Sequence, residues 1–257
     1  MDDPEIKEMV RNRYGSIASG GCCGGDAPCG GDVAEQSRKM GYSEADLQAA
    51  GEGANLGLGC GNPQAIALLR VGEVVVDLGS GAGFDCFLSA RAVGPSGRVI
   101  GVDMTHEMLA RARANAARLG LENVEFRLGE ISFLPVADGI ADVVISNCVI
   151  NLVPEKEQVF REAFRVLKPG GRLAVSDVVN IAPLPPELAA DRALVSGCVA
   201  GAASVPRLEA MLRAAGFASI RIVPKAESRD LVASWAPGRS IEDYVASASM
   251  TAEKPRT

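Results

Sequence analysis

The sequence predicts an α/β fold in which helices cover both faces of a parallel β-sheet. Between about residues 62 and 178, strand-like runs alternate with helix-like segments at the spacing of right-handed β–α–β crossovers. Apolar side chains fill the centre of the fourth run, Val143-Val144-Ile145, as expected for a strand that is covered on both faces. A glycine-rich segment follows the first strand, which is typical of a ligand-binding turn.

Each element of this core is assigned from its local pattern. The five strands are short runs rich in β-branched residues, and they cover residues 74–78, 98–103, 124–128, 142–146 and 172–177. The helices between them cover residues 84–93, 107–119 and 155–167. Gly120 ends the second helix, and Lys168-Pro169-Gly170-Gly171 closes the third.

Two further regions flank the core, so that the chain divides into residues 1–61, 62–178 and 179–257. In the first region, a charged segment over 1–14 is compatible with a helix, and Ser43 begins a second helix with acidic residues in its first turn. Between them, residues 15–31 hold seven glycines and three cysteines, which predicts irregular structure.

The third region begins with a proline-rich linker. Helices are expected over about 187–195 and 206–215, and a late strand over 219–223. The final stretch, which contains Trp235, shows no pattern that assigns it.

Composition excludes several classes of protein. With 257 residues, 47% hydrophobic and 23% charged, the chain is an ordinary globular protein. Its net charge of −6 argues against a nucleic-acid partner, and no run of about 18 apolar residues predicts a membrane span. The acidic start, Met1-Asp2-Asp3-Pro4-Glu5, is not a secretory signal. We therefore expect a cytoplasmic protein whose seven cysteines are thiols.

The sequence contains one histidine, His106, at the start of a predicted helix. Serine–histidine hydrolysis, histidine-ligated zinc catalysis and histidine general-base chemistry would all depend on this residue. Its position indicates an exposed first turn, so we expect it to have no chemical role.

The turn after the first strand reads Asp77-Leu78-Gly79-Ser80-Gly81-Ala82-Gly83-Phe84. Glycines there let the backbone approach a ligand and offer it N–H groups. The third glycine comes one residue too early for a dinucleotide motif, and no Lys-Ser/Thr follows as in a phosphate-binding loop. Asp77 would repel a pyrophosphate but could pair with a cationic amino group, and Asp103 at the end of the second strand could accept two ribose hydroxyls.

A ligand with a ribose and a positive amino group but no phosphate matches S-adenosylmethionine. The sequence therefore predicts an S-adenosylmethionine site on a Rossmann-like sheet. Met104 would lie beside the adenine, with Glu130 and Ile131 at its edge. The predicted cofactor-binding residues are Asp77, Gly79, Gly81, Asp103, Met104, Glu130, Ile131 and Asn147.

Three cysteines occur in contexts that differ from an ordinary buried thiol. Cys148 directly follows the fourth strand, at the sheet edge where open α/β sheets bind ligands, and would face the cofactor's methyl group. Cys60 and Cys198 have small neighbours that would leave their thiols accessible. The sequence lacks the C-x-x-C pair that is typical of a zinc site. A set of three thiols suits a soft, three-coordinate ion. Cys86, inside a helix, is expected to be structural.

Four segments together resemble the bacterial arsenite S-adenosylmethionine methyltransferases: Gly57-Leu58-Gly59-Cys60-Gly61-Asn62-Pro63, Asp77-Leu78-Gly79-Ser80-Gly81-Ala82-Gly83-Phe84-Asp85, Ile145-Ser146-Asn147-Cys148-Val149-Ile150-Asn151-Leu152 and Ser196-Gly197-Cys198-Val199-Ala200-Gly201. Many methyltransferases share the glycine turn, whereas the three cysteine segments are specific. The resemblance extends from Tyr14-Gly15 to Glu242-Asp243-Tyr244. It implies a class I S-adenosylmethionine-dependent methyltransferase fold, with an N-terminal extension and a smaller C-terminal As(III)-binding region.

The resemblance further implies that Cys148 and Cys198 hold As(III), with Cys60 as the third thiol. Arsenite or its thiol conjugates would be the substrate, for arsenic detoxification. It also implies that an N-terminal cysteine forms a redox pair with Cys60, and that a thioredoxin or glutathione system restores the thiols. The candidates are Cys22, Cys23 and Cys29.

Two other functions are compatible with parts of the sequence. A methyltransferase for a small organic acceptor, such as a quinone ring, would keep the glycine turn but not need Cys148 or Cys198. A protein that sequesters arsenic or a metal without turnover would need the thiols but neither Asp77 nor Asp103. The product's degree of methylation, the oligomeric state and activity on antimony are left open.

Overall fold

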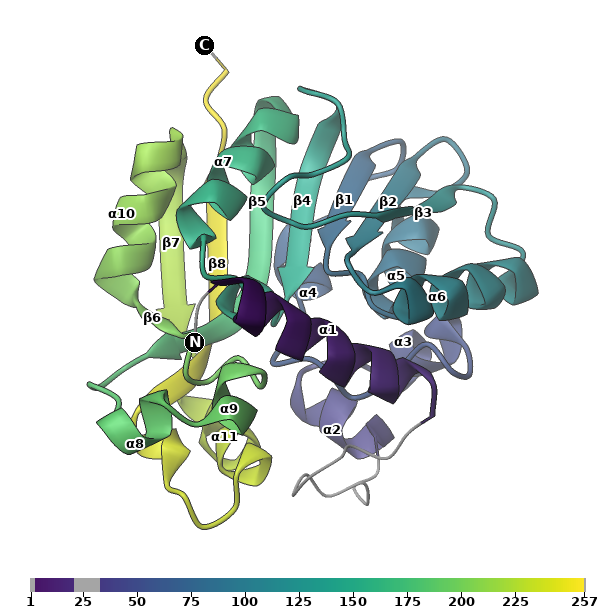
Figure 1. Ribbon diagram of the computed structural model, residues 1–257. Helices are drawn as coiled ribbons and strands as arrows, with labels where there is room; N and C mark the ends of the chain where they lie inside the picture. Colours follow the sequence, from purple (N-terminus) through teal and green to yellow (C-terminus); the bar gives the residue numbers. More distant parts are fainter. Residues whose placement is uncertain (1–2, 21–32, 257) are drawn as a thin grey trace.

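The computed structural model describes residues 3–20 and 33–256. Its centre is one twisted sheet in the order β3-β2-β1-β4-β5-β8-β7, with β6 paired to β5 (Figure 1). The first five strands are parallel, and they are β1 (Val74–Leu78), β2 (Arg98–Asp103), β3 (Val124–Leu128), β4 (Ala141–Asn147) and β5 (Leu167–Asn180). The predicted parallel α/β core is confirmed.

Alternation along the strands builds two cores, one on each face of the sheet. Val75 packs against α5 (Phe84–Val93) and α6 (His106–Leu119), whereas its neighbour Val76 lies on the face covered by α7 (Lys156–Val166) and α10 (Val205–Ala215). Both faces are therefore apolar, and the polar groups of these strands gather where the strands end.

The smaller elements surround the carboxyl ends of the parallel strands. The helix α1 (Asp3–Ala18) crosses in front of this edge and contacts α6 and η1 (Ile150–Leu152) (Figure 1). The other short elements are α2 (Val33–Lys39), α3 (Glu44–Ala50), α4 (Gln64–Ala67), α8 (Pro186–Ala189), α9 (Arg192–Val195), β6 (Ala203–Ser204), η2 (Ala226–Ser228), α11 (Arg229–Trp235) and η3 (Ile241–Asp243).

The N-terminal predictions were partly right. Ser43 caps α3 through a reciprocal pair of hydrogen bonds with Asp46, as the acidic first turn indicated. The predicted irregular segment at 15–31 was wrong at its start, because α1 continues through Gly15 to Ala18. Cys22, Cys23 and Cys29 lie outside the described residues.

The C-terminal half needed three corrections. The strand predicted at 172–177 runs from Leu167 to Asn180, because β8 (Val245–Glu253) pairs with it from Arg172 to its end. The helix predicted over 187–195 is two short helices, since Asp191 caps α9 by accepting from the Leu194 N–H. The unassigned final stretch forms α11 and the antiparallel strand β8, which lies between β5 and β7 (Ala218–Pro224).

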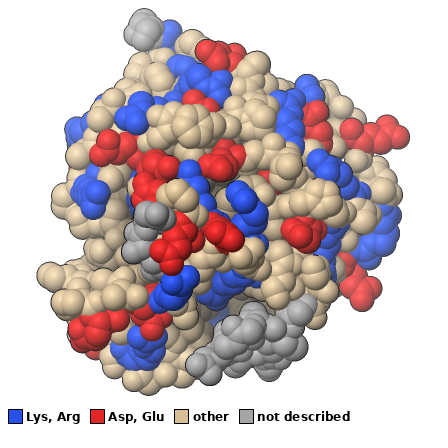
Figure 2. Space-filling model, in the orientation of Figure 1, with Lys and Arg blue, Asp and Glu red and all other residues tan. Residues whose placement is uncertain are grey.

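The surface drawn in Figure 2 mixes acidic and basic side chains without a large area of one sign. None of the helices over residues 3–20 and 33–256 is both long and apolar enough to cross a membrane. His106 is exposed at the first residue of α6, as predicted.

Candidate active site

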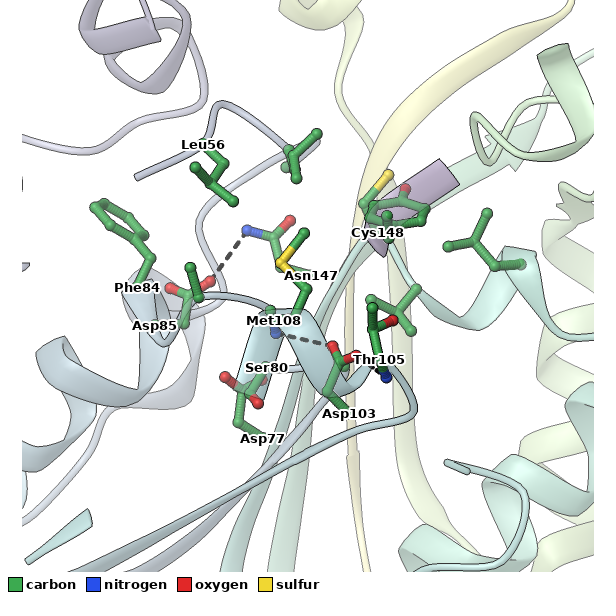
Figure 3. A pocket seen from close by; sticks show the side chains of 18 of the residues that line it. Leu56, Asp77, Ser80, Phe84, Asp85, Asp103, Thr105, Met108, Asn147 and Cys148 are labelled. Atoms are coloured by element: carbon green, nitrogen blue, oxygen red, sulfur yellow. Dashed lines mark hydrogen bonds between the residues drawn. The ribbon is translucent and has the colours of Figure 1, made fainter. Parts of the chain in front are cut away.

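One cavity at the carboxyl edge of the sheet brings together every residue predicted to bind the cofactor (Figure 3). They come from the ends of β1, β2 and β4 and from the segments that follow β1, β2 and β3. The cavity is also lined by Cys148, so the glycine turn and one of the three candidate thiols share a single space. The predicted residues that line it are Asp77, Gly79, Gly81, Asp103, Met104, Glu130, Ile131 and Asn147.

The glycine turn is shaped by close packing on one side and open space on the other. Gly79 has a φ of +69°, and a Cβ there would lie 2.5 Å from the Val149 side chain. Gly81 has a φ of +52°, but a Cβ there would meet nothing within 4 Å. Gly79 therefore allows the turn to contact the segment that carries Cys148, and Gly81 opens toward the cavity.

Three N–H groups of this turn, those of Gly79, Ser80 and Gly81, already have partners within the protein, so the turn offers a ligand fewer donors than expected from sequence. Gly79 and Ser80 both donate to the carbonyl of Val102, and Gly81 donates to Oδ2 of Asp103 at 2.9 Å. The turn thus binds the end of β2 and fixes the Asp103 carboxylate.

Of the two acids at the strand ends, Asp77 is buried and Asp103 is partly buried, and they have different hydrogen-bond partners. Asp103 accepts from the N–H groups of Gly81 and Thr105; burial raises its pKa, and these two bonds oppose the rise. Asp77 accepts from the thiol of Cys86 at 3.2 Å. Burial raises the pKa of Asp77 well above its usual range, and the nearby Asp85 carboxylate adds to this. Cys86 is fully buried, as predicted, but it also has this polar contact.

A hydrogen-bonded network that the sequence did not predict joins this cavity to residues 57–63, the Cys60 loop. The amide nitrogen of Asn147 donates to Oδ2 of Asp85 at 3.2 Å (Figure 3). It also donates to the Tyr42 hydroxyl at 3.0 Å. The Tyr42 hydroxyl in turn donates to Asp85 at 2.8 Å. Asn147 also donates to Gly61 O and accepts from the Cys60 N–H. Asp85 is part of the glycine segment, whereas no local signal marks Tyr42.

The three candidate thiols meet beyond β4. Cys148 packs in one cluster with Cys60 and Cys198, and its Sγ atom lies within 4.8 Å of that of Cys60. The Cys198 thiol also donates to the carbonyl oxygen of Cys148 at 2.8 Å. Residues 88 and 50 positions apart in sequence are therefore brought to one point, as their contexts suggested.

The expected accessibility of Cys60 and Cys198 was wrong, because each is only 1% exposed. Small neighbours do not open the Cys60 loop but let it pack tightly. A Cβ at Gly59 would lie 2.9 Å from Nδ2 of Asn147, and one at Gly61 would lie 2.9 Å from Oγ of Ser176. Of the three thiols, only that of Cys148 belongs to a residue lining the cavity.

Burial keeps these thiols protonated in the free protein. It raises the pKa of Cys60 to about 11. The contact with Cys198 lowers the pKa of Cys148, but its contact with Cys60 and its burial raise it further, so that it lies well above the usual value. The pKa of Cys198 is raised by its contact with Cys148 and by burial.

The helix α1 forms one wall of the cavity, which the sequence did not indicate. Lys7 bonds to both Glu130 and Glu155 at 2.9 Å, and Val10 and Tyr14 line the cavity. Tyr14 packs in the same apolar cluster as Cys60, Cys148 and Cys198. An amphipathic helix at the N-terminus gives no signal of which sheet edge it covers.

The chain is similar to known methyltransferases along most of its length. The family model described as "Methyltransferase domain" matches residues 69–216. The arsenite methyltransferase of Halobacterium salinarum is 53% identical over 99% of this chain and 68% of its own length. That of Aquipseudomonas alcaligenes is 49% identical over 64% of this chain, and this match spans about half of that protein.

The fold is also similar to that of a solved methyltransferase structure. The arsenic(III) S-adenosylmethionine methyltransferase of Chlamydomonas reinhardtii matches with a TM-score of 0.62 and 31% identity. The match covers 90% of this chain and 74% of the algal one.

Proposed function

The chain belongs to the arsenite methyltransferase family, and on that premise we propose that it transfers methyl groups from S-adenosylmethionine to As(III) held by Cys60, Cys148 and Cys198. The observation that carries the proposal is the position of Cys148. It lines the cavity proposed for the cofactor and packs beside Cys60 and Cys198. An arsenic atom bound there would lie at the boundary between the two sites.

The cavity fits the cofactor because it holds polar groups that lack partners. The Ser80 hydroxyl is buried without a hydrogen bond to any described residue. Asp77 is 3% exposed, and among the described residues its carboxylate accepts a hydrogen bond only from the thiol of Cys86. A cationic amino group would satisfy Asp77, and ribose hydroxyls would bond to Asp103. Met104 and Ile131 offer apolar surface for the adenine, beside Glu130. When bound, S-adenosylmethionine supplies a methyl group on a positively charged sulfur.

Arsenite capture would proceed without a base from the protein. Each cysteine S–H that reacts with As(OH)3 forms one As–S bond and releases one water, because the thiol proton leaves with the hydroxide. Three thiols therefore give one neutral As(SR)3 and three waters. The raised pKa values of the thiols are compatible with this route, since no free thiolate has to be buried.

Methyl transfer would depend on position. The arsenic lone pair is already free, so the protein would not have to remove a proton and would only have to hold the arsenic toward the methyl group that the cofactor supplies. Cys148, Cys60 and Cys198 hold the arsenic at the cavity edge, and α1 helps to exclude water. The C-terminal region, residues 179–257, contributes Cys198 to this site.

Methylation raises arsenic from the trivalent to the pentavalent state, so a two-electron reductant must restore it. We include in the proposal a thiol reductant, from a glutathione or thioredoxin system, and a redox pair of Cys60 with Cys22, Cys23 or Cys29. The biological context would be cytoplasmic arsenic detoxification.

Chromatography of arsenic species after incubation with As(III), thiol and S-adenosylmethionine tests this proposal. We expect methylated arsenic from the parent and from Cys86→Ser, which keeps a donor for Asp77, and none from Cys148→Ser. Equal product from Cys148→Ser would keep arsenic methylation but remove Cys148 from its mechanism. Arsenic bound by the parent without any methylated product would favour sequestration.

A further inference from the structure

A fourth donor, the carboxylate of Asp177, lies beside the thiols. Its oxygen and the Sγ atoms of Cys60 and Cys148 all lie within 4.8 Å of one another. Within residues 3–20 and 33–256, this group brings together two sulfur donors and one oxygen donor from the Cys60 loop, the residue after β4, and β5. The proposed methylation uses the two thiols but not Asp177.

Asp177 is a buried carboxylate that forms no salt bridge with any described residue, although the Lys156 ammonium is near enough to favour its charged form. It is 1% exposed. Its bonds come from neutral donors, the N–H groups of Ile150 and Val178 and the amide of Asn151, at 2.8 to 3.0 Å. A buried charge of this kind is costly unless a cation lies next to it.

Arsenic(III) does not supply that cation. Three thiols convert arsenite to a neutral, pyramidal As(SR)3, and the third of them is Cys198. The Cys198 thiol points instead to the Cys148 carbonyl at 2.8 Å, and Cys198 is not in the group with Asp177. The two sets of donors therefore share Cys60 and Cys148 and differ in the third member.

A divalent, thiophilic cation matches the second set. Zinc binds thiolates at about 2.3 Å and carboxylate oxygens at about 2.1 Å in tetrahedral sites, so small movements of atoms already within 4.8 Å would complete three bonds. A carboxylate that binds metal is usually held by further hydrogen bonds, as Asp177 is. A water or the Cys198 thiol could take the fourth position.

We propose that Cys60, Cys148 and Asp177 form a site for a divalent thiophilic cation, Zn²⁺ or its heavier congener Cd²⁺, and that this ion excludes As(III) from the shared thiols. Binding forms two metal–sulfur bonds and one metal–oxygen bond and releases the two thiol protons, with no change of oxidation state. Inhibition of methylation by these ions rests on the proposed function; the site itself does not.

Titration of the reduced full-length protein with Cd²⁺, without arsenic or S-adenosylmethionine, tests the site through the ultraviolet thiolate-to-cadmium absorption. We expect one ion per chain, and Asp177→Asn to weaken Cd²⁺ by at least about tenfold. As(III) affinity, measured by quenching of Trp235, should change less in Asp177→Asn. Cys198→Ser should have the opposite effect, so that the affinity for As(III) falls more than the affinity for Cd²⁺. Asp138→Asn, at an exposed carboxylate, should leave both unchanged.

Equal loss of both ligands in Asp177→Asn would overturn the proposal, because Asp177 would then only support the segment that carries Cys148. X-ray absorption on the zinc-loaded parent gives a second test that needs no variant. Two sulfur neighbours and at least one oxygen neighbour are expected, and a shell of sulfur alone would also overturn it. If Cd²⁺ binds as described but no arsenic is methylated, the proposed function fails and the cation site stands.

Discussion

The thiol of Cys198 donates to the carbonyl oxygen of Cys148, 2.8 Å away, and both residues have left-handed backbones. Their φ angles are +67° and +58°, and among the described residues only three other non-glycine residues have a positive φ. Such backbones are unfavourable for residues with a Cβ, so the surrounding structure must hold them. A Cβ at Gly201 would lie 2.1 Å from Asn151 O, which shows how closely the two cysteine segments pack. The protein's own packing thus fixes the relative position of these two cysteines.

Asp103 should contribute to cofactor binding without affecting arsenic. Asp103→Ala removes the acceptor predicted for the ribose and leaves the N–H groups of Gly81 and Thr105 unpaired. We expect the affinity for S-adenosylhomocysteine, measured by calorimetry, to fall about tenfold or more. As(III) quenching of Trp235 is the control and should be retained. An unchanged cofactor affinity would show that Asp103 does not face the ribose.

Gly79 and Gly120 separate the effect of packing from that of backbone strain. Both have positive φ, at +69° and +64°, but a Cβ at Gly120 would meet nothing within 4 Å, whereas one at Gly79 would overlap Val149. Gly120→Ala should cost about 1 kcal/mol in the free energy of unfolding. Gly79→Ala should cost about 1 to 3 kcal/mol more and weaken cofactor binding. Equal losses in urea denaturation would contradict the close contact.

Stability should fall in mild alkali because of the buried thiols. The pKa of Cys60 is raised from 9.0 to about 11, so folding favours the protonated thiol. Its contribution is complete below pH 9 and is lost as the pH rises toward 11. Over that window the parent should lose about 2 kcal/mol more unfolding free energy than Cys60→Ser. Parallel pH profiles in urea denaturation would mean that this thiol is not desolvated.

Asn147 should be important for stability as well as for the site. Asn147→Ala would leave the Cys60 N–H and Gly61 O without the partners that Asn147 provides. It would also remove the hydrogen bond from Asn147 to Oδ2 of Asp85. We expect a loss of about 3 kcal/mol in unfolding free energy. Asn12→Ala, at an exposed position on α1, should change it by less than about 0.5 kcal/mol. A stable Asn147→Ala variant would contradict the network.

The core was predictable because its signals are local. Strands at 74–78, 98–103 and 124–128 and the helix at 84–93 have the predicted bounds, since apolar periodicity and glycine stops lie within each element. Strand ends in a parallel sheet share one edge, so Asp77 and Asp103 could be grouped from sequence.

What could not be predicted depends on contacts between distant segments. Strand β8 is rich in alanine and serine and is defined by its pairing with β5 and β7. The burial of Cys60 was missed because glycines signal both flexible and closely packed backbone, and only Asn147 and Ser176 decide between them. Asp177 could have been noticed, because it ends a predicted strand as Asp103 does.

The central claim is that As(III) is held by the three thiols of Cys60, Cys148 and Cys198. X-ray absorption at the arsenic edge, on the reduced protein with one equivalent of As(III), measures its neighbours directly. The parent should show three sulfur neighbours, and Cys198→Ser should show two sulfurs and one oxygen. Oxygen neighbours in the parent, or three sulfurs in Cys198→Ser, would contradict the account.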